Sequence, residues 1–222
     1  MAHRRRGTAL WEFIAEIEFV PSRLYIAGVG VDLQDINDFH TDFPNADICG
    51  WEPNPIIWKG FSDSFPGTLL EAALSDQNGE QKLFYIPNWK NGSTLSVPEN
   101  PIRVQEAMVR TERLDLYTSE PNSILCLDCE GSELKALQGA GKFLDNVSLI
   151  DVEMTGRGRH KDWPSPVEIH RFLMAHGFLQ TYIHTIRVVR GQFNAVYVRR
   201  EIFKPEMCSV MASVEDFELG RF

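Results

Sequence analysis

The chain of 222 residues is poor in cysteine and contains no long apolar run. Its four cysteines, Cys49, Cys126, Cys129 and Cys208, are too few and too scattered for a disulfide-stabilised scaffold. No apolar run approaches the roughly 18–20 residues of a membrane-spanning helix. The basic start, MAHRRRGTALWEF, lacks the apolar core and cleavage site of a secretion signal. These absences predict a cytoplasmic protein that does not associate with a membrane.

Positive charge is also scarce, because 22 Lys and Arg stand against 31 Asp and Glu and the formal charge is −9. Hydrophobic residues make up 43% of the chain and charged residues 24%, as in a folded domain rather than a disordered chain. The acidic balance disfavours nucleic acid as a partner, although it leaves room for a local basic patch.

Short apolar runs alternate with amphipathic segments over residues 24–200, which predicts an α/β domain with a doubly wound, mostly parallel sheet. We expect strands at residues 24–30, 47–52, 68–76, 82–87, 103–109, 123–128, 147–153, 178–184 and 194–200, and a polar loop over residues 88–101. Helices are expected at residues 33–43, 55–61, 132–144 and 166–176. Residues 1–23 are interpreted as a helical N-terminal segment, and residues 201–222 as a C-terminal tail that lies on the surface or contacts a partner.

The first expected strand ends in a glycine turn. Gly28 and Gly30 allow the backbone to approach a ligand, and the helix that follows offers free N–H groups, although such glycines can also serve packing alone. The dinucleotide-binding pattern G-x-G-x-x-G fails at its third position, where Leu33 stands. This failure disfavours a nucleotide-linked oxidoreductase.

Acidic residues end the second and third expected strands. Glu52 follows Gly30 by 22 residues, about the spacing at which a carboxylate accepts hydrogen bonds from both ribose hydroxyls. Asp76 would lie at the same sheet edge and could reach a base or an amino group. The alternatives are an exposed strand-end glutamate and a turn-forming aspartate before Asn78. Together the three strand ends indicate a cofactor that contains a nucleoside.

The segment LDCEGSELKALQGA carries the sharpest pattern. Asp128 and Glu130 end an apolar strand and share one side of it, because strand side chains alternate. Ser132 could instead cap the following helix, with Glu130 or Glu133 near its positive end. Because burying an unpaired carboxylate is costly, we expect this pair at an accessible edge of the sheet.

This segment resembles the FkbM family of S-adenosylmethionine-dependent methyltransferases, as do WEPNP, ALSDQNGE and DVEMTGRGRHKDWPSPVEIHRFLMAHGF. The resemblance covers roughly residues 24–200. It implies a class I methyltransferase fold, with a doubly wound, mostly parallel seven-stranded sheet, an antiparallel last strand and helices on both faces. It also implies contacts with S-adenosylmethionine, with the methionine part at Gly28 and Gly30, the ribose at Glu52, the adenine at Asp76 and the methyl group at Asp128.

One position departs from the pattern of methyltransferases. The acid that commonly stands two residues before the first glycine is replaced by Ile26, and Asp32 is the expected substitute from the other side of the turn. A non-catalytic protein that keeps the fold and binds a nucleotide or cofactor is therefore the alternative to an enzyme.

Transfer of a methyl group from a sulfonium depends on alignment, and a hydroxyl acceptor also needs a base. We expect Asp128 or Glu153 to be that base, or the two to share a divalent metal; Glu153 could instead pair with Arg157 or Arg159. The basic island at Arg157, Arg159 and His160 could bind an anionic small molecule, such as a sugar or nucleotide, or be a solvated loop. The predicted function is O-methylation of such an acceptor.

Overall fold

The computed structural model describes residues 9–30, 33–87, 89–98, 103–156, 162–187, 191–207 and 214. Its main elements are, in chain order, α1 (Ala9–Glu16), β1 (Arg23–Ala27), α2 (Gln34–Asp42), β2 (Asp47–Trp51), α3 (Pro55–Phe61), β3 (Thr68–Leu70), β4 (Ala73–Leu74), β5 (Gly79–Ile86), β6 (Trp89–Thr94), β7 (Gln105–Glu112), β8 (Ser123–Leu127), α4 (Glu133–Gln138), β9 (Val147–Thr155), α5 (Pro166–Ala175), β10 (Phe178–Arg187) and β11 (Gln192–Arg199). Three short 3-10 helices are η1 (Leu114–Leu116), η2 (Gly141–Asn146) and η4 (Pro205–Met207).

Seven strands form a large sheet in the order β10-β11-β9-β8-β1-β2-β3. The neighbours from β9 to β3 run parallel, whereas β11 lies antiparallel between β9 and β10. Sequence reasoning therefore predicted the doubly wound sheet and its antiparallel last strand correctly. Because the parallel strands all point the same way, their carboxyl ends meet at one edge of the sheet.

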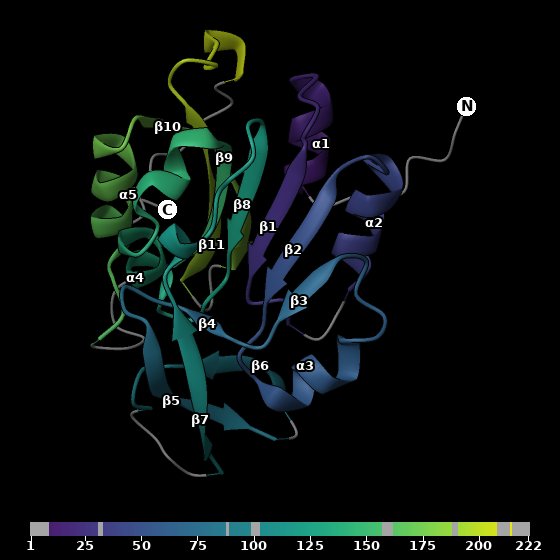
Figure 1. The fold of residues 1–222 in the computed structure, drawn as a ribbon. Coiled ribbons are helices and arrows are strands. Elements are labelled where there is room, and N and C mark those ends of the chain that lie inside the picture. The colour runs from purple at the N-terminus through teal and green to yellow at the C-terminus, as the bar shows by residue number, and fades with distance from the viewer. Residues whose placement is uncertain are drawn as a thin grey trace.

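Helices cover both faces of this sheet, as Figure 1 shows, and each face has its own core. The strand side chains alternate between the two: Tyr25 and Leu125 pack with α4 and α5, while Leu24 and Ile124 pack with α1 and α2. Near-continuous apolar strands such as β8 are expected when both faces of a parallel sheet are buried.

A second, four-stranded sheet in the order β4-β7-β5-β6 lies below the large one in Figure 1. It corrects two predictions. The single strand expected over residues 68–76 is split, because the chain turns at the exposed Glu71, so that β3 pairs with β2 and β4 pairs with β7. The polar loop expected over residues 88–101 contains β6, whose strand conformation comes from its pairing with β5 rather than from an apolar pattern of its own.

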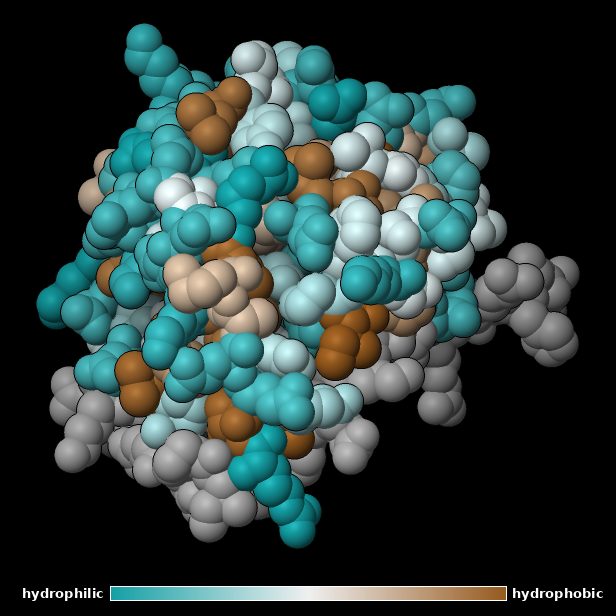
Figure 2. Space-filling model, turned by 60° about the horizontal axis from the view of Figure 1, so that its bottom comes forward, coloured by the Kyte–Doolittle hydropathy of each residue, from teal (hydrophilic) through white to brown (hydrophobic). Residues whose placement is uncertain are grey.

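The lower end of the molecule, turned forward in Figure 2, is largely hydrophilic, and its apolar residues form small separate patches.

Near the C-terminus of the chain, Met207 and Val214 are buried, and the backbone N–H of Val214 donates to Gln180 Oε1 at 3.2 Å. In the part of the chain that the structure describes, no helix is long and apolar enough to cross a membrane.

Candidate active site

The turns that follow β1, β2 and β8 are joined to one another at the carboxyl edge of the large sheet. The backbone N–H of Gly28 donates to the carbonyl of Trp51 at 3.0 Å, and the N–H of Asp128 donates to the carbonyl of Ala27 at 3.0 Å. The glycine turn therefore lies between the turn that carries Glu52 and the turn that carries Asp128.

Glu52 is 3% exposed, and both of its carboxylate oxygens are held by backbone N–H groups. Oε2 accepts from Gly30 at 3.2 Å, and Oε1 accepts from Asn54 at 2.8 Å. Burial raises the pKa of Glu52 from its ordinary value of 4.5 to about 7, although the N–H groups of Asn54, Gly30 and Val29 favour the charged form. The predicted ribose ligand thus contacts the predicted glycine turn directly.

The two glycines of the turn differ in the space that surrounds them. Both have a positive φ, +81° at Gly28 and +68° at Gly30. A Cβ added at Gly28 would lie 1.8 Å from the carbonyl oxygen of Asp128, whereas a Cβ at Gly30 would meet no atom of the described residues within 4 Å. Packing between adjacent turns therefore requires Gly28, while the open space at Gly30 leaves room for a ligand.

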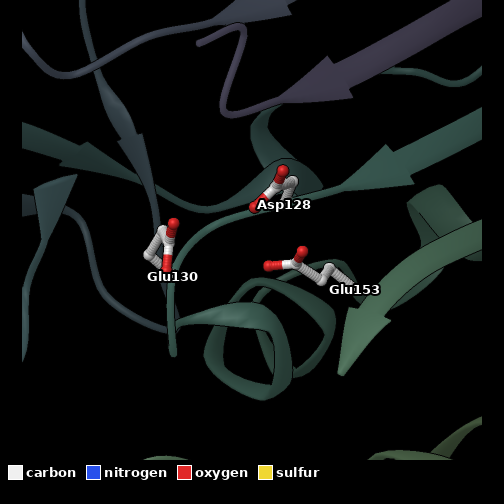
Figure 3. A group of neighbouring side chains, drawn as sticks. All are labelled: Asp128, Glu130 and Glu153. Carbon is white, nitrogen blue, oxygen red and sulfur yellow. The ribbon is translucent and has the colours of Figure 1, made fainter. Parts of the chain in front are cut away.

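Asp128, Glu130 and Glu153 form one group, with one carboxylate oxygen of each lying within 4.8 Å of the others. Figure 3 shows the three side chains converging from the end of β8, from the turn that follows it and from β9. Asp128 is exposed, Glu130 is half-buried and Glu153 is buried. The structure therefore brings the two predicted bases, Asp128 and Glu153, together with a third acid.

Glu133 holds the turn that presents this group. Glu130 and Gly131 both have a positive φ, +46° and +98°. The buried carboxylate of Glu133 accepts from the N–H of Cys129 at 2.9 Å and from the N–H of Gly131 at 3.1 Å. Burial raises the pKa of Glu133 to about 7. Ser132 stands at the N-cap position of α4 and Glu133 in its first turn, as the alternative interpretation of this segment expected, but the Ser132 side chain makes no capping hydrogen bond.

Strand β6 of the small sheet contacts two of the turns at the edge. Thr94 Oγ1 donates to the backbone carbonyl of Glu130 at 2.7 Å, and Ser93 Oγ accepts from Asn54 Nδ2 at 2.9 Å. Asn54 is the same residue whose backbone N–H donates to Glu52. The small sheet therefore braces both the turn after β2 and the turn after β8.

Asp76 follows β4, in the connection that leads to β5. Its Oδ1 accepts from Ser75 Oγ at 3.1 Å, and its backbone carbonyl accepts from Arg113 Nη1 at 2.9 Å. Its predicted contact with adenine stays a prediction. Four further predicted residues, Asp32, Arg157, Arg159 and His160, lie outside the described residues.

Further buried polar residues continue from the acid group across the sheet, and of these the sequence did not lead us to expect Asp151 or Gln192 at the site. Gln192 Nε2 donates to Glu153 Oε2 at 3.4 Å, and Asp151 Oδ1 lies 3.1 Å from His184 Nε2. The signal was the alternation in VSLIDVEMT, where Asp151 and Glu153 occupy one face of an otherwise apolar strand. A β-bulge between residues 180 and 182 shifts the alternation of β10, which the sequence does not reveal.

Comparison with known proteins identifies the family of this domain. The family model described as Methyltransferase FkbM domain matches residues 27–179, which confirms the family indicated by the sequence motifs. No curated protein matches the chain in sequence.

Two solved structures show the same fold, each with a TM-score of 0.50. One is magnesium protoporphyrin IX methyltransferase (ChlM) from Synechocystis PCC 6803 with bound SAM, at 10% identity over 86% of this chain and 76% of that one. The other is the plantazolicin methyltransferase BpumL in complex with a triazolic desmethylPZN analog and SAH, at 8% identity over 85% of this chain and 81% of that one.

Proposed function

The chain belongs to the FkbM methyltransferase family, and we propose that it transfers the methyl group of S-adenosylmethionine to a hydroxyl group of a small-molecule acceptor. The observation that carries the proposal is the arrangement of acids at one sheet edge, with Glu52 on the glycine turn and Asp128, Glu130 and Glu153 around the end of β8. Negative charge at this edge favours a cationic sulfonium. The two structures with the same fold hold SAM or SAH, which supports this cofactor.

The ribose is assigned to Glu52 and the methionine part to the turn at Gly28 and Gly30. Oε2 of Glu52 accepts from Gly30 and Oε1 accepts from Asn54, and because a carboxylate offers about four acceptor positions, Glu52 can also accept from a ribose hydroxyl. Adenine is assigned to Asp76, and Asp32 to the same cofactor, as predicted from the sequence.

In this proposal the acceptor oxygen attacks the methyl carbon, the C–S bond breaks as the O–C bond forms, and the hydroxyl proton passes to a carboxylate. Asp128 or Glu153 is that base, and their shared position at the sheet edge supports the assignment. A divalent cation shared by the two is the second way in which this pair would activate the hydroxyl. The chain's residues otherwise act by alignment, which is the main requirement of an in-line displacement.

The acceptor is proposed to be small and anionic, because Arg157, Arg159 and His160 follow β9 and form a basic island in an acidic chain. Guanidinium groups suit phosphate and carboxylate groups. The alternative function is that of a non-catalytic protein, which would bind the cofactor at the same site but would not transfer its methyl group.

Calorimetric titration with S-adenosylmethionine and S-adenosylhomocysteine tests the cofactor site. We expect saturable binding by the wild-type chain, a weaker affinity in Glu52→Ala, and an unchanged affinity in Glu80→Ala, which removes an exposed acid of β5. Absence of binding at high micromolar ligand would overturn the proposal.

Release of S-adenosylhomocysteine from a panel of hydroxylated sugars, sugar phosphates and nucleotides tests the reaction. Each acceptor is paired with its deoxy or O-methylated analogue, and we expect turnover only where a free hydroxyl is present. Cofactor binding without turnover of any acceptor would favour the non-catalytic alternative.

A further inference from the structure

We propose that Asp128, Glu130 and Glu153 bind one hard divalent cation, such as Mg²⁺, Mn²⁺ or Ca²⁺, with Gln192 orienting Glu153. The cation site stands on the geometry of these residues alone. Its role in methyl transfer rests on the proposed function, whose active site it shares.

The spacing of the three carboxylates matches the coordination sphere of one cation. Their ligand oxygens lie within 4.8 Å of one another. Oxygens on opposite sides of a single ion are about 4.0–4.2 Å apart for Mg²⁺ and about 4.6–5.2 Å apart for Ca²⁺, given the usual metal–oxygen distances. The 4.8 Å limit therefore lies within the span of a Ca²⁺ shell and slightly above that of a Mg²⁺ shell.

Gln192 is an independent observation that points to a ligand. Its side chain is 3% exposed and reaches Glu153, with 3.4 Å between Nε2 and Oε2. Its other amide atom, Oε1, is buried, and among the described residues nothing donates a hydrogen bond to it. A buried carbonyl oxygen without a donor is costly. A water molecule of the cation's shell would supply that donor, while Nε2 fixes the orientation of the ligating carboxylate.

The three ligands come from segments that are held in place before any ion arrives. Glu130 stands in a turn fixed on one side by Glu133 and on the other by Thr94. Glu153 is on a strand paired with β8 and β11.

The donor set selects a hard cation rather than zinc. All three ligands are carboxylates, which suit Mg²⁺, Mn²⁺ and Ca²⁺. The nearest thiol along the chain is that of Cys129, which is half-buried. The thiol of Cys129 donates to the carbonyl oxygen of Ala27, with 3.9 Å between the sulfur and the oxygen, and so is engaged outside the acid group.

A cation at this position would bind the acceptor hydroxyl. It would lower the pKa of that hydroxyl, so that the proton is lost more easily to a carboxylate or to water and the oxygen attacks as an alkoxide. The ion would keep its oxidation state, because the methyl transfer needs neither an oxidant nor a reductant.

Titration of the metal-free chain with Mn²⁺ and with Ca²⁺, in the absence of S-adenosylmethionine, tests the site by calorimetry. We expect one ion per chain, and a loss of at least about tenfold in affinity in Glu130→Gln and in Asp128→Asn, because each removes a charged ligand. Gln192→Leu should weaken binding by about 10–100-fold, as for other residues that orient a metal ligand. The matched control is Glu106→Gln, which removes an acid from the small sheet that pairs with Lys82 at 2.8 Å, and it should bind like the wild type.

Circular dichroism of each metal-free variant shows that it is folded before its affinity is compared. If Glu130→Gln bound Mn²⁺ and Ca²⁺ as tightly as the wild type does, the inference would be overturned. No saturable binding up to millimolar ion, with S-adenosylmethionine still bound, would overturn it and leave the proposed function standing. Saturable ion binding by a chain that does not bind S-adenosylmethionine would uphold the cation site and overturn the proposed function.

Discussion

The hydroxyl of Thr94 donates a 2.7 Å hydrogen bond to the backbone carbonyl of Glu130, and so joins the small sheet to the turn that presents the acid group. Thr94 is buried and also accepts from the N–H of Ser96 at 3.1 Å. The neighbouring Ser93 accepts a hydrogen bond from Asn54, whose backbone N–H donates to Glu52. The small sheet therefore takes part in the geometry of the site.

Removing the Thr94 hydroxyl should misplace Glu130. We expect Thr94→Val to lower kcat and to weaken Mn²⁺ binding, because the left-handed turn at Glu130 loses its donor, while the affinity for S-adenosylmethionine changes little. Thr94→Ser keeps the hydroxyl and should restore both values. Steady-state kinetics and calorimetry on the two variants check this, and a Thr94→Ser variant as impaired as Thr94→Val would contradict it.

The affinity for S-adenosylmethionine should rise with pH. Burial raises the pKa of Glu52 to about 7, so the carboxylate that would accept from the ribose becomes charged between pH 6 and 8. Titrations across this range should show tighter binding at the higher pH. Glu52→Gln should bind weakly with a flatter profile, and a wild-type affinity independent of pH would argue against Glu52 as the ribose ligand.

The free energy of unfolding should fall as pH rises, whereas the affinity for S-adenosylmethionine should rise. The unfolded chain releases the Glu52 proton near 4.5, whereas the folded chain keeps it to about 7. The folded state thus binds more protons in this window, and its free energy of unfolding falls as pH rises from about 4.5 to 7, by about 3 kcal/mol for this group. Urea unfolding of wild type and Glu52→Gln at several pH values checks this. The wild type should lose stability relative to Glu52→Gln over that window, and parallel curves would contradict the expectation.

Alanine at the two glycines of the turn should separate folding from binding. Gly28→Ala places a Cβ 1.8 Å from the Asp128 carbonyl oxygen and should strongly lower the melting temperature. The Cβ of Gly30→Ala meets no atom of the described residues within 4 Å, and the substitution should cost only the strain of a positive φ, about 1–2 kcal/mol. It should nevertheless weaken cofactor binding, and full affinity in a folded Gly30→Ala would show that the ligand does not approach this turn.

Glu133 should matter mainly to the integrity of the turn. Glu133→Ala leaves the buried N–H groups of Cys129 and Gly131 without their acceptor, which costs about 1–3 kcal/mol for each group. Glu133→Gln keeps an acceptor oxygen and should be the milder change. Thermal and urea unfolding measure both, and an alanine variant as stable as the wild type would show that these hydrogen bonds contribute little.

The sequence was sufficient for the large sheet because buried strands such as Leu24–Ala27 and Ile124–Leu127 are continuously apolar and end in glycines or acids. It was insufficient for the small sheet. Strand β6, with the sequence WKNGST, has no apolar periodicity, and its conformation depends on pairing with β5, which lies before it in the chain. Tertiary pairing of this kind overrides local preference.

The same contrast holds at the site. Glu52, Asp128 and Glu153 could be placed because each belongs to the end of a predicted parallel strand, and such ends share an edge. The role of Glu133 could not, because it depends on the left-handed turn at residues 130–131 that its own carboxylate stabilises. Gln192 was equally hidden, since its contact with Glu153 exists only once β11 is inserted beside β9.

The place of β11 in the sheet also makes the surroundings of Glu153 depend on a segment that is synthesised late. Glu153 lies on β9, and Asn194 of β11 is its partner across the strand pair. Until residues 192–199 have emerged from the ribosome, β9 has an open edge and the amide of Gln192 is missing from the acid group. A chain that ends before that point lacks both the strand partner of Glu153 and the hydrogen bond from Gln192. The surroundings of Glu153 are therefore completed by one of the last described strands of the chain.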